Sequence, residues 1–310
     1  MAQLNLRMAA APRFPTFTAH CWRAVALLAL PLALGACSPR LLLVRGMADS
    51  LAAQGQTTED DLVLAREASA FYLKLSESLS SEVPDHLPLA QALASGFTQY
   101  AYAFVAFEAE RTEARDSRAA QVLRERAARL YARANRHAMA ALERSQPGFR
   151  QALQSANAQD WPRLRSEQIG LAYWAAASWG GLISLSKDQP DTVADLPLAM
   201  RLASLAYAAQ PGYGQGALAG LMASFEAARP GGSSAQALRY FDQAIALGAG
   251  QSAAPLLAKA EGVALPAADR ATFDALLQQA LAVAAAHPNL SNAVMRERAL
   301  WLQASADDLF

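Results

Sequence analysis

The sequence predicts an all-α protein, and two observations lead to this fold class. Alanine is abundant and β-branched residues are few, a composition that favours helices over strands. Glycine and proline fall between long segments in which apolar side chains recur every three or four residues. At 310 residues, the chain is also long enough to bury a substantial core.

The N-terminus predicts a lipoprotein signal peptide over residues 1–36. Arginines come first, followed by an apolar run of about thirteen residues, Ala24–Ala36, which is too short to span a bilayer comfortably. The run ends in the lipobox sequence LGAC at Leu34–Cys37, so we expect lipid on Cys37. The alternatives are an ordinary signal peptide with an incidental cysteine, or an uncleaved anchor. Aspartate after the cysteine would indicate inner-membrane retention in Gram-negative bacteria, so Ser38 favours the outer membrane, facing the periplasm.

Charge and cysteine content exclude some classes of function. The chain holds 27 basic and 27 acidic residues, and three of the arginines but no acidic residue precede Cys37. A chain that begins at Cys37 therefore has a net charge of −3 and no basic field for nucleic acid. Cys21 and Cys37 are the only cysteines, so no disulfide is expected in the mature chain.

Residues 37–56 are predicted as an anchor and linker, and residues 57–310 as a single helical domain. Thr57–Asp61 supplies a cap and an acidic first turn for the first helix of that domain. Val83–Asp85, with its central proline, ends this helix. One helical face is apolar, with residues at three- to four-residue spacing: Leu64, Ala68, Phe71, Leu75 and Leu79.

Further helices are expected at nine places along the domain, separated by breaks such as Pro230–Gly232. The arginines of the helix expected over Ser117–Ser145 form a mostly solvated face, although such a face also suits an acidic partner. The expected ranges are Leu89–Glu110, Ser117–Ser145, Gly170–Ser186, Asp195–Gln210, Gln215–Ala228, Ser234–Leu247, Ala253–Val263, Ala267–His287 and Leu290–Asp307.

Gly170–Ser186, GLAYWAAASWGGLISLS, is expected to be the buried helix against which the others pack. It carries no charge, and a helix that is apolar all round lies either in a protein core or in a membrane. Its glycine, serine and tyrosine residues make it only mildly apolar, so we favour a core over a second membrane segment. Small residues such as Ala176 and Gly180 predict close contact with neighbouring helices.

A degenerate repeat is present in the loops. The segment Ala141–Phe149, ALERSQPGF, is similar to Leu205–Tyr213, LAYAAQPGY, and their prolines lie 64 residues apart. Pro84 precedes Pro147 by 63 residues, and both spacings are near twice the tetratricopeptide period of about 34. The sequence therefore predicts stacked antiparallel helical hairpins, irregular and tetratricopeptide-like.

The chain carries no recognisable catalytic motif. His86, His137 and His287 are far apart, and none has a partner at metal-ligand spacing. Asp307–Asp308 is interpreted as a helix end and not as a catalytic pair. We therefore expect no enzyme, no metal and no cofactor, with a hydrolase of scattered active-site residues as the remaining alternative.

Aromatic side chains are the candidates for contact with a ligand, although core packing is the preferred interpretation of each. The candidates are Tyr100, Tyr102, Tyr173, Trp174 and Trp179.

Two segments of the central region, YWAAASWG at Tyr173–Gly180 and ISLSKD at Ile183–Asp188, resemble the TatT family. These are the lipoprotein T-components associated with some TRAP-type transporters. Further matching pieces follow the family's order along nearly all of the mature chain: the lipobox at Cys37, Phe97–Val105, Ala128–Ala134, Pro190–Asp191, Val193–Pro197, Pro211–Tyr213, Arg298–Leu302 and Ala306–Phe310.

The resemblance implies a lipid-anchored, periplasmic, all-helical protein of cryptic tetratricopeptide repeats. The family is associated with homotrimers that have a hydrophobic passage. It is also associated with the substrate-binding P-component, whose ligand then passes to a TRAP permease. The implied function is a non-catalytic component that docks the binding protein and holds a hydrophobic or organic-acid ligand. The alternative is an envelope-assembly scaffold whose repeats bind other proteins.

Overall fold

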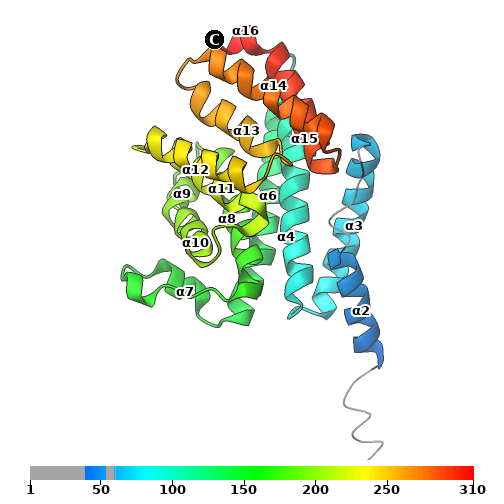
Figure 1. The fold of residues 1–310 in the computed structure, drawn as a ribbon. Helices are drawn as coiled ribbons and strands as arrows, with labels where there is room; N and C mark the ends of the chain where they lie inside the picture. Colours follow the sequence, from blue (N-terminus) through cyan, green and yellow to red (C-terminus); the bar gives the residue numbers. More distant parts are fainter. Residues whose placement is uncertain (1–38, 54–58, 60) are drawn as a thin grey trace, which may run out of the picture. The chain divides into compact units, whose positions relative to one another are not determined.

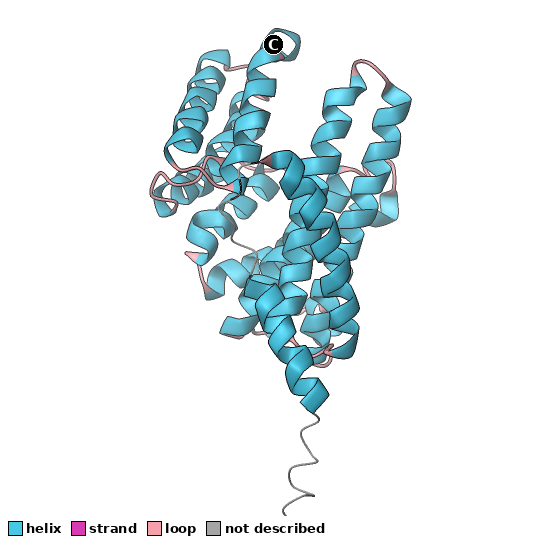
Figure 2. Cartoon of the chain, turned by 90° about the vertical axis from the view of Figure 1, so that its right-hand side faces the viewer, coloured by secondary structure: helices cyan, strands magenta, loops and turns pink. Residues whose placement is uncertain are grey.

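The structure is a computed structural model that describes residues 39–53, 59 and 61–310, and it describes side chains from residue 43 onward. The chain divides into two units, residues 1–44 and residues 45–310, and the second unit contains the fold discussed below. Throughout the described residues the only regular elements are helices, joined by turns and loops (Figure 2). The prediction of an all-α protein is therefore confirmed.

The helices follow one another with short connections (Figure 1). The first seven are α2 (Pro39–Ala53), α3 (Leu62–Glu82), α4 (Leu87–Ala101), α5 (Phe107–Glu113), α6 (Ser117–Ser145), α7 (Phe149–Gln154) and α8 (Ser166–Ser184). The remaining eight are α9 (Pro190–Val193), α10 (Leu196–Ala209), α11 (Ala217–Ala228), α12 (Ser234–Leu247), α13 (Ala254–Lys259), α14 (Arg270–Ala286), α15 (Leu290–Ala304) and α16 (Ala306–Leu309). No helix in the described part of the chain is both long enough and apolar enough to cross a membrane.

Several helices begin where a short polar side chain satisfies their first free N–H groups. The carboxylate of Asp61 accepts from the backbone of α3, Asp116 caps α6, and Asp269 caps α14. Asn289 caps α15 in the same way. Because such caps are short-range features, these helix starts lie within three residues of the expected positions.

Helix α8 is the centre of the first and largest core. It packs against α4, α6 and α10, and its residues Leu171, Ala172 and Ala175 are fully buried. The buried amide of Gln168 is satisfied at both ends, because its oxygen accepts from Arg165 N and its nitrogen donates to Ser145 Oγ. The expectation of a buried central helix agrees with this packing, although the helix begins one turn earlier than expected.

Glycines allow α8 to approach its neighbours closely. A Cβ atom at Gly181 would lie 2.6 Å from the ring of Tyr131, and one at Gly180 would lie 2.9 Å from the ring of Phe225. Both distances are shorter than carbon atoms tolerate, so these rings occupy the space that a side chain would need. The predicted close contact at Gly180 is therefore present in the structure.

Two helices contain a π-helical turn. The expected helix Leu89–Glu110 is interrupted by the π-helical segment η1 (Tyr102–Ala106), which joins α4 to α5. A second segment of this kind, η4 (Ala260–Ala264), follows α13. Such turns are rare and frequently accompany functional sites, because they redirect the side chains around them.

Helix α3 has two unlike apolar faces. The inward face is built mainly from small or polar side chains, such as Ala65 and Ser76, with Leu73 as its bulky contact. Leu73 packs onto α4 at Gly96, where a Cβ would lie 2.7 Å from Leu73 Cδ2. The apolar face expected from the sequence is the other one, and its Leu64, Phe71 and Leu75 are exposed.

Candidate functional site: a pocket between α3, α5 and α15

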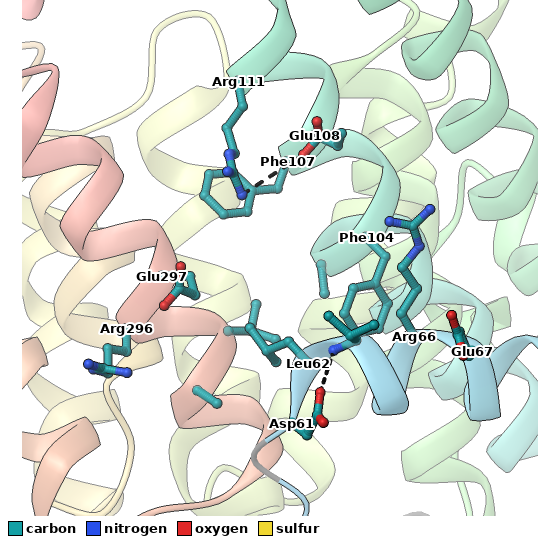
Figure 3. Close-up of a pocket in the computed structure, with 14 residues that line it drawn as sticks. Asp61, Leu62, Arg66, Glu67, Phe104, Phe107, Glu108, Arg111, Arg296 and Glu297 are labelled. Carbon is teal, nitrogen blue, oxygen red and sulfur yellow. Dashed lines mark hydrogen bonds and ion pairs between the residues drawn. The ribbon is translucent and has the colours of Figure 1, made fainter.

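A pocket of about 680 Å³ lies where the N-terminal half of α3 meets η1, α5 and α15 (Figure 3). The residues that line the pocket come from three separate parts of the sequence: 61–67, 103–111 and 293–297. The volume falls in the range of small-molecule binding sites.

Apolar side chains form much of the pocket wall. Leu62 and Val63 come from α3, Phe104 and Phe107 from the η1–α5 region, and Val294 from α15. The ring of Phe107 is held in place from behind by Trp301, with ring centroids 5.6 Å apart in an edge-to-face arrangement.

Charged side chains complete the lining. The acidic members are Asp61, Glu67, Glu108 and Glu297, and the basic members are Arg66, Arg111 and Arg296. Arg111 lies 3.9 Å from Glu108 and stacks over Phe107 at 5.6 Å from the ring centroid. In the described part of the chain, neither Arg66 nor Arg296 has a hydrogen-bond or ion-pair partner, so both guanidinium groups are available to an anionic group.

Behind Phe107 lies a buried ion cluster centred on Arg298 of α15. Its guanidinium donates to Glu261 of η4 at 2.6 and 3.0 Å and to Glu110 of α5 at 3.0 Å. The same group packs over the rings of Tyr102 and Phe107, at 5.6 and 5.3 Å from their centroids. Arg298 thus ties both π-helical turns to α15 and fixes the back of the pocket.

Burial and charge shift the ionisation of this cluster. Burial raises the pKa of the Glu110 carboxyl, against the opposing effect of the Arg298 charge. Burial would lower the pKa of Arg298, but the facing Tyr102, Glu261 and Glu110 raise it instead. The guanidinium of Arg298 therefore stays charged beside these groups.

The candidate aromatics lie in separate places. Tyr100 is buried behind the pocket and contacts Phe104 edge to face, with centroids 5.5 Å apart. Tyr102 lies under Arg298, as described above. Neither residue lines the pocket, but both support its wall.

The other candidate aromatics belong to α8. Tyr173 packs against Trp174 and Tyr213, at centroid distances of 4.8 and 5.4 Å, as part of the first core. Trp179 donates its indole N–H to Asp195 at 3.3 Å. The structure thus does not bring the five candidates together, and Cys37 lies outside the described residues.

Two histidines of the described region, His86 and His137, make contacts that support the fold. His86 caps α4 by accepting from Leu89 N, and its Nε2 lies 3.0 Å from Asp49. His137 stacks on Phe97, with ring centroids 5.9 Å apart, and lies 2.9 Å from Glu77. Within residues 39–53, 59 and 61–310, no group of three or more histidine, cysteine or acidic side chains is arranged to hold a metal ion.

Sequence reasoning did not identify the pocket residues. They come from three helices, and Leu62 and Val294 are separated by most of the domain. The adjacent opposite charges Arg66–Glu67 and Arg296–Glu297 are the signal that they share, but such pairs are common on solvated helix faces. Only the packing of α3 beside α15 gives them a common role.

The structure is thus an all-helical scaffold with a pocket that aromatic and charged side chains line. Comparison with known proteins gives the family. The sequence model of the family described as TRAP transporter T-component matches residues 58–310. The chain belongs to this family, whose members are accessory components of a transport system. The resemblance stated from the sequence is thereby confirmed.

A relative from Treponema pallidum (strain Nichols) is similar over most of its length. It is 29% identical to this chain over 267 residues, which cover 82% of each sequence. Its description is "Uncharacterized protein", so it contributes no functional assignment of its own.

Proposed function

We propose that this chain is a lipid-anchored, non-catalytic component of a TRAP-type transport system. It docks the substrate-binding protein and holds a hydrophobic or organic-acid ligand in the pocket between α3, α5 and α15. The observation that carries this proposal is the pairing of an apolar lining with two unpaired arginines, Arg66 and Arg296, in a member of the T-component family. An apolar wall suits a hydrocarbon body, and a guanidinium suits a carboxylate.

The proposed setting follows from the N-terminal sequence and the family. Residues 1–36 are removed as a signal peptide, Cys37 carries the lipid, and residues 37–56 connect the anchor to a single domain of tetratricopeptide-like hairpins. The domain faces the periplasm from the outer membrane and assembles as a homotrimer. The lipobox and Ser38 support the anchor and its location, and the family resemblance supports the trimer.

The docking part of the proposal is tested with the full-length lipoprotein, extracted in detergent and mixed with a purified TRAP substrate-binding protein. We expect the native chain to associate. Reversal of the two unpaired charges, R66E/R296E, should weaken association or ligand retention at least tenfold. The matched control is R129E, a charge reversal on the exposed face of α6.

The outcomes separate the possibilities. If the native chain does not bind the TRAP substrate-binding protein, the docking proposal is wrong. Capture of envelope-assembly proteins in its place would favour the scaffold alternative. If R66E/R296E and R129E behave alike, the function does not use this pocket. Mass spectrometry of small molecules that copurify with the native chain identifies the ligand class.

A further inference from the structure

Helix α3 presents its bulkier apolar face to solvent. Leu64 is 53% exposed, Phe71 is 67% exposed and Leu75 is 38% exposed. The buried residues on the inward face of the same helix are Ala65, Ser76 and a single leucine, Leu73. A helix that turns its larger apolar face outward has an unfilled contact there.

The spacing on this face is that of a helix–helix seam. Leu64, Ala68, Phe71 and Leu75 follow one another at intervals of four, three and four residues, which is the a/d spacing of a coiled coil. We call these four residues the α3 seam. The helix that carries them is already folded against α4, so a partner does not have to induce it.

We propose that the α3 seam pairs with the α3 seam of a second copy of this chain, antiparallel and about a two-fold axis. In that register Leu64 faces the partner's Leu75, and the small Ala68 faces the bulky ring of the partner's Phe71. A parallel pair would place phenylalanine on phenylalanine and alanine on alanine, which gives one overfilled and one underfilled layer. In the antiparallel pair, each of the two central layers contains one alanine and one phenylalanine.

Charge on the flank of the seam favours the same pairing. Glu67 and Lys74 lie one heptad apart along one edge, so an antiparallel partner brings Glu67 to the partner's Lys74 on each side of the axis. Lys74 bonds Glu77 at 2.7 Å, but its side chain is 65% exposed. Glu77 keeps Arg133 and His137 if Lys74 turns outward. In a parallel pair, Glu67 would meet Tyr72 and gain no ion pair.

This contact is distinct from the pocket and does not rest on the proposed transport function. None of the four seam residues lines the pocket, whereas Glu67 both lines the pocket and flanks the seam. A two-fold contact joins copies in pairs, whether the unit that is joined is one chain or a three-fold assembly.

The test uses the full-length lipoprotein in detergent and measures protein mass by light scattering. We expect F71E to halve the assembled mass of the native chain without changing its helical content, because Phe71 makes little contact within the monomer. The matched control is V122E, which places the same charge on an exposed valine of α6, 59% exposed. An equal mass for the native chain and F71E would overturn the proposal. This holds also if the seam binds the transporter's binding protein and not a second copy.

Orientation has its own readout. E67K should weaken pairing at least tenfold, and the double exchange E67K/K74E should restore it. Oxidation of a mixture of L64C and L75C should give cross-links between the two variants, with the native chain as the blank. Cross-links of L64C to itself would show a parallel pair and overturn the antiparallel register.

Discussion

Glu77 is the residue on which the N-terminal helices converge. Its carboxylate accepts from Lys74 at 2.7 Å and from Arg133, and His137 Nε2 lies 2.9 Å away. Arg133 is also stacked over Phe97, 5.0 Å from the ring centroid. Burial alone would raise the pKa of Glu77, but the hydrogen bonds from these three side chains outweigh it and lower the pKa from 4.5 to about 2.

This lowered pKa predicts a loss of stability in acid. A carboxyl whose pKa is lower in the folded state stabilises the fold above its unfolded pKa, and the contribution disappears as pH falls towards the folded value. E77Q should lower the free energy of unfolding by about 2 kcal/mol at pH 7, with a smaller loss between pH 4.5 and 2 than in the native chain. Urea denaturation at several pH values measures both effects.

The control for Glu77 is Glu125, an exposed carboxylate on α6 that lies 4.0 Å from Arg129. E125Q should change stability by less than about 0.5 kcal/mol at any pH. Parallel stability curves for E77Q and the native chain would show that the convergent hydrogen bonds do not stabilise the fold.

At the scale of the element, α8 depends on glycine where α6 crosses it. A Cβ atom at Gly181 would lie only 2.6 Å from the ring of Tyr131. Because Tyr131 is buried, its ring has little room to move away. G181A should therefore lower the free energy of unfolding by about 1–2 kcal/mol, despite the better helix propensity of alanine.

The matched substitution is G220A in α11, where the new Cβ would meet Ala244 Cβ at an ordinary 3.8 Å. With no clash, propensity decides, and G220A should raise stability by about 0.5–1 kcal/mol. Thermal or urea unfolding of both variants shows whether the two changes in stability have opposite signs. A stabilising G181A would mean that Tyr131 moves aside freely.

Sequence reasoning succeeded where local features determine an element. Helices α6 and α12 have the expected bounds because Asp116 and Ser233 cap their starts and loops break the chain beyond their ends. The helix expected over Leu89–Glu110 is present, but the sequence did not indicate the π-helical turn of η1, whose Tyr102 lies against Arg298, a residue almost 200 positions away. The apolar stripe of α3 was identified correctly, but no local pattern shows which face of a helix is covered.

The candidate site shows the same limit more strongly. Aromatic residues stand out in the sequence, and Tyr173 and Trp174 are used in the core. The pocket is instead defined by ordinary charged residues such as Arg66 and Arg296, which acquire meaning only when α3 and α15 lie side by side. The position of the pocket depends on long-range packing, which leaves no short motif in the sequence.

At the scale of the whole molecule, attachment to the membrane is expected to depend on one thiol. No described helix is long and apolar enough to cross a bilayer, and Cys37 is the last residue of a complete lipobox. C37A should therefore leave the chain in the soluble fraction after cell disruption, because stable anchoring requires the acyl chains that this residue would carry. Partitioning between the membrane and soluble fractions, followed by immunoblotting, measures this.

The control is C21A, which changes a cysteine ahead of the lipobox and should leave the chain in the membrane fraction. Retention of C37A with membranes would contradict the lipid anchor and point to an uncleaved N-terminal segment.

The two π-helical turns set where the chain tolerates a change in length. A π turn holds one residue more than the α-helical turn that it replaces, so removal of one residue from Tyr102–Ala106 or Ala260–Ala264 leaves the flanking helices facing as they do now. A deletion within α6 would instead rotate every later residue of that helix by about 100°. We therefore expect single-residue gaps between homologous sequences to gather at these two segments, with the orientation of Phe107 and its pocket wall unchanged.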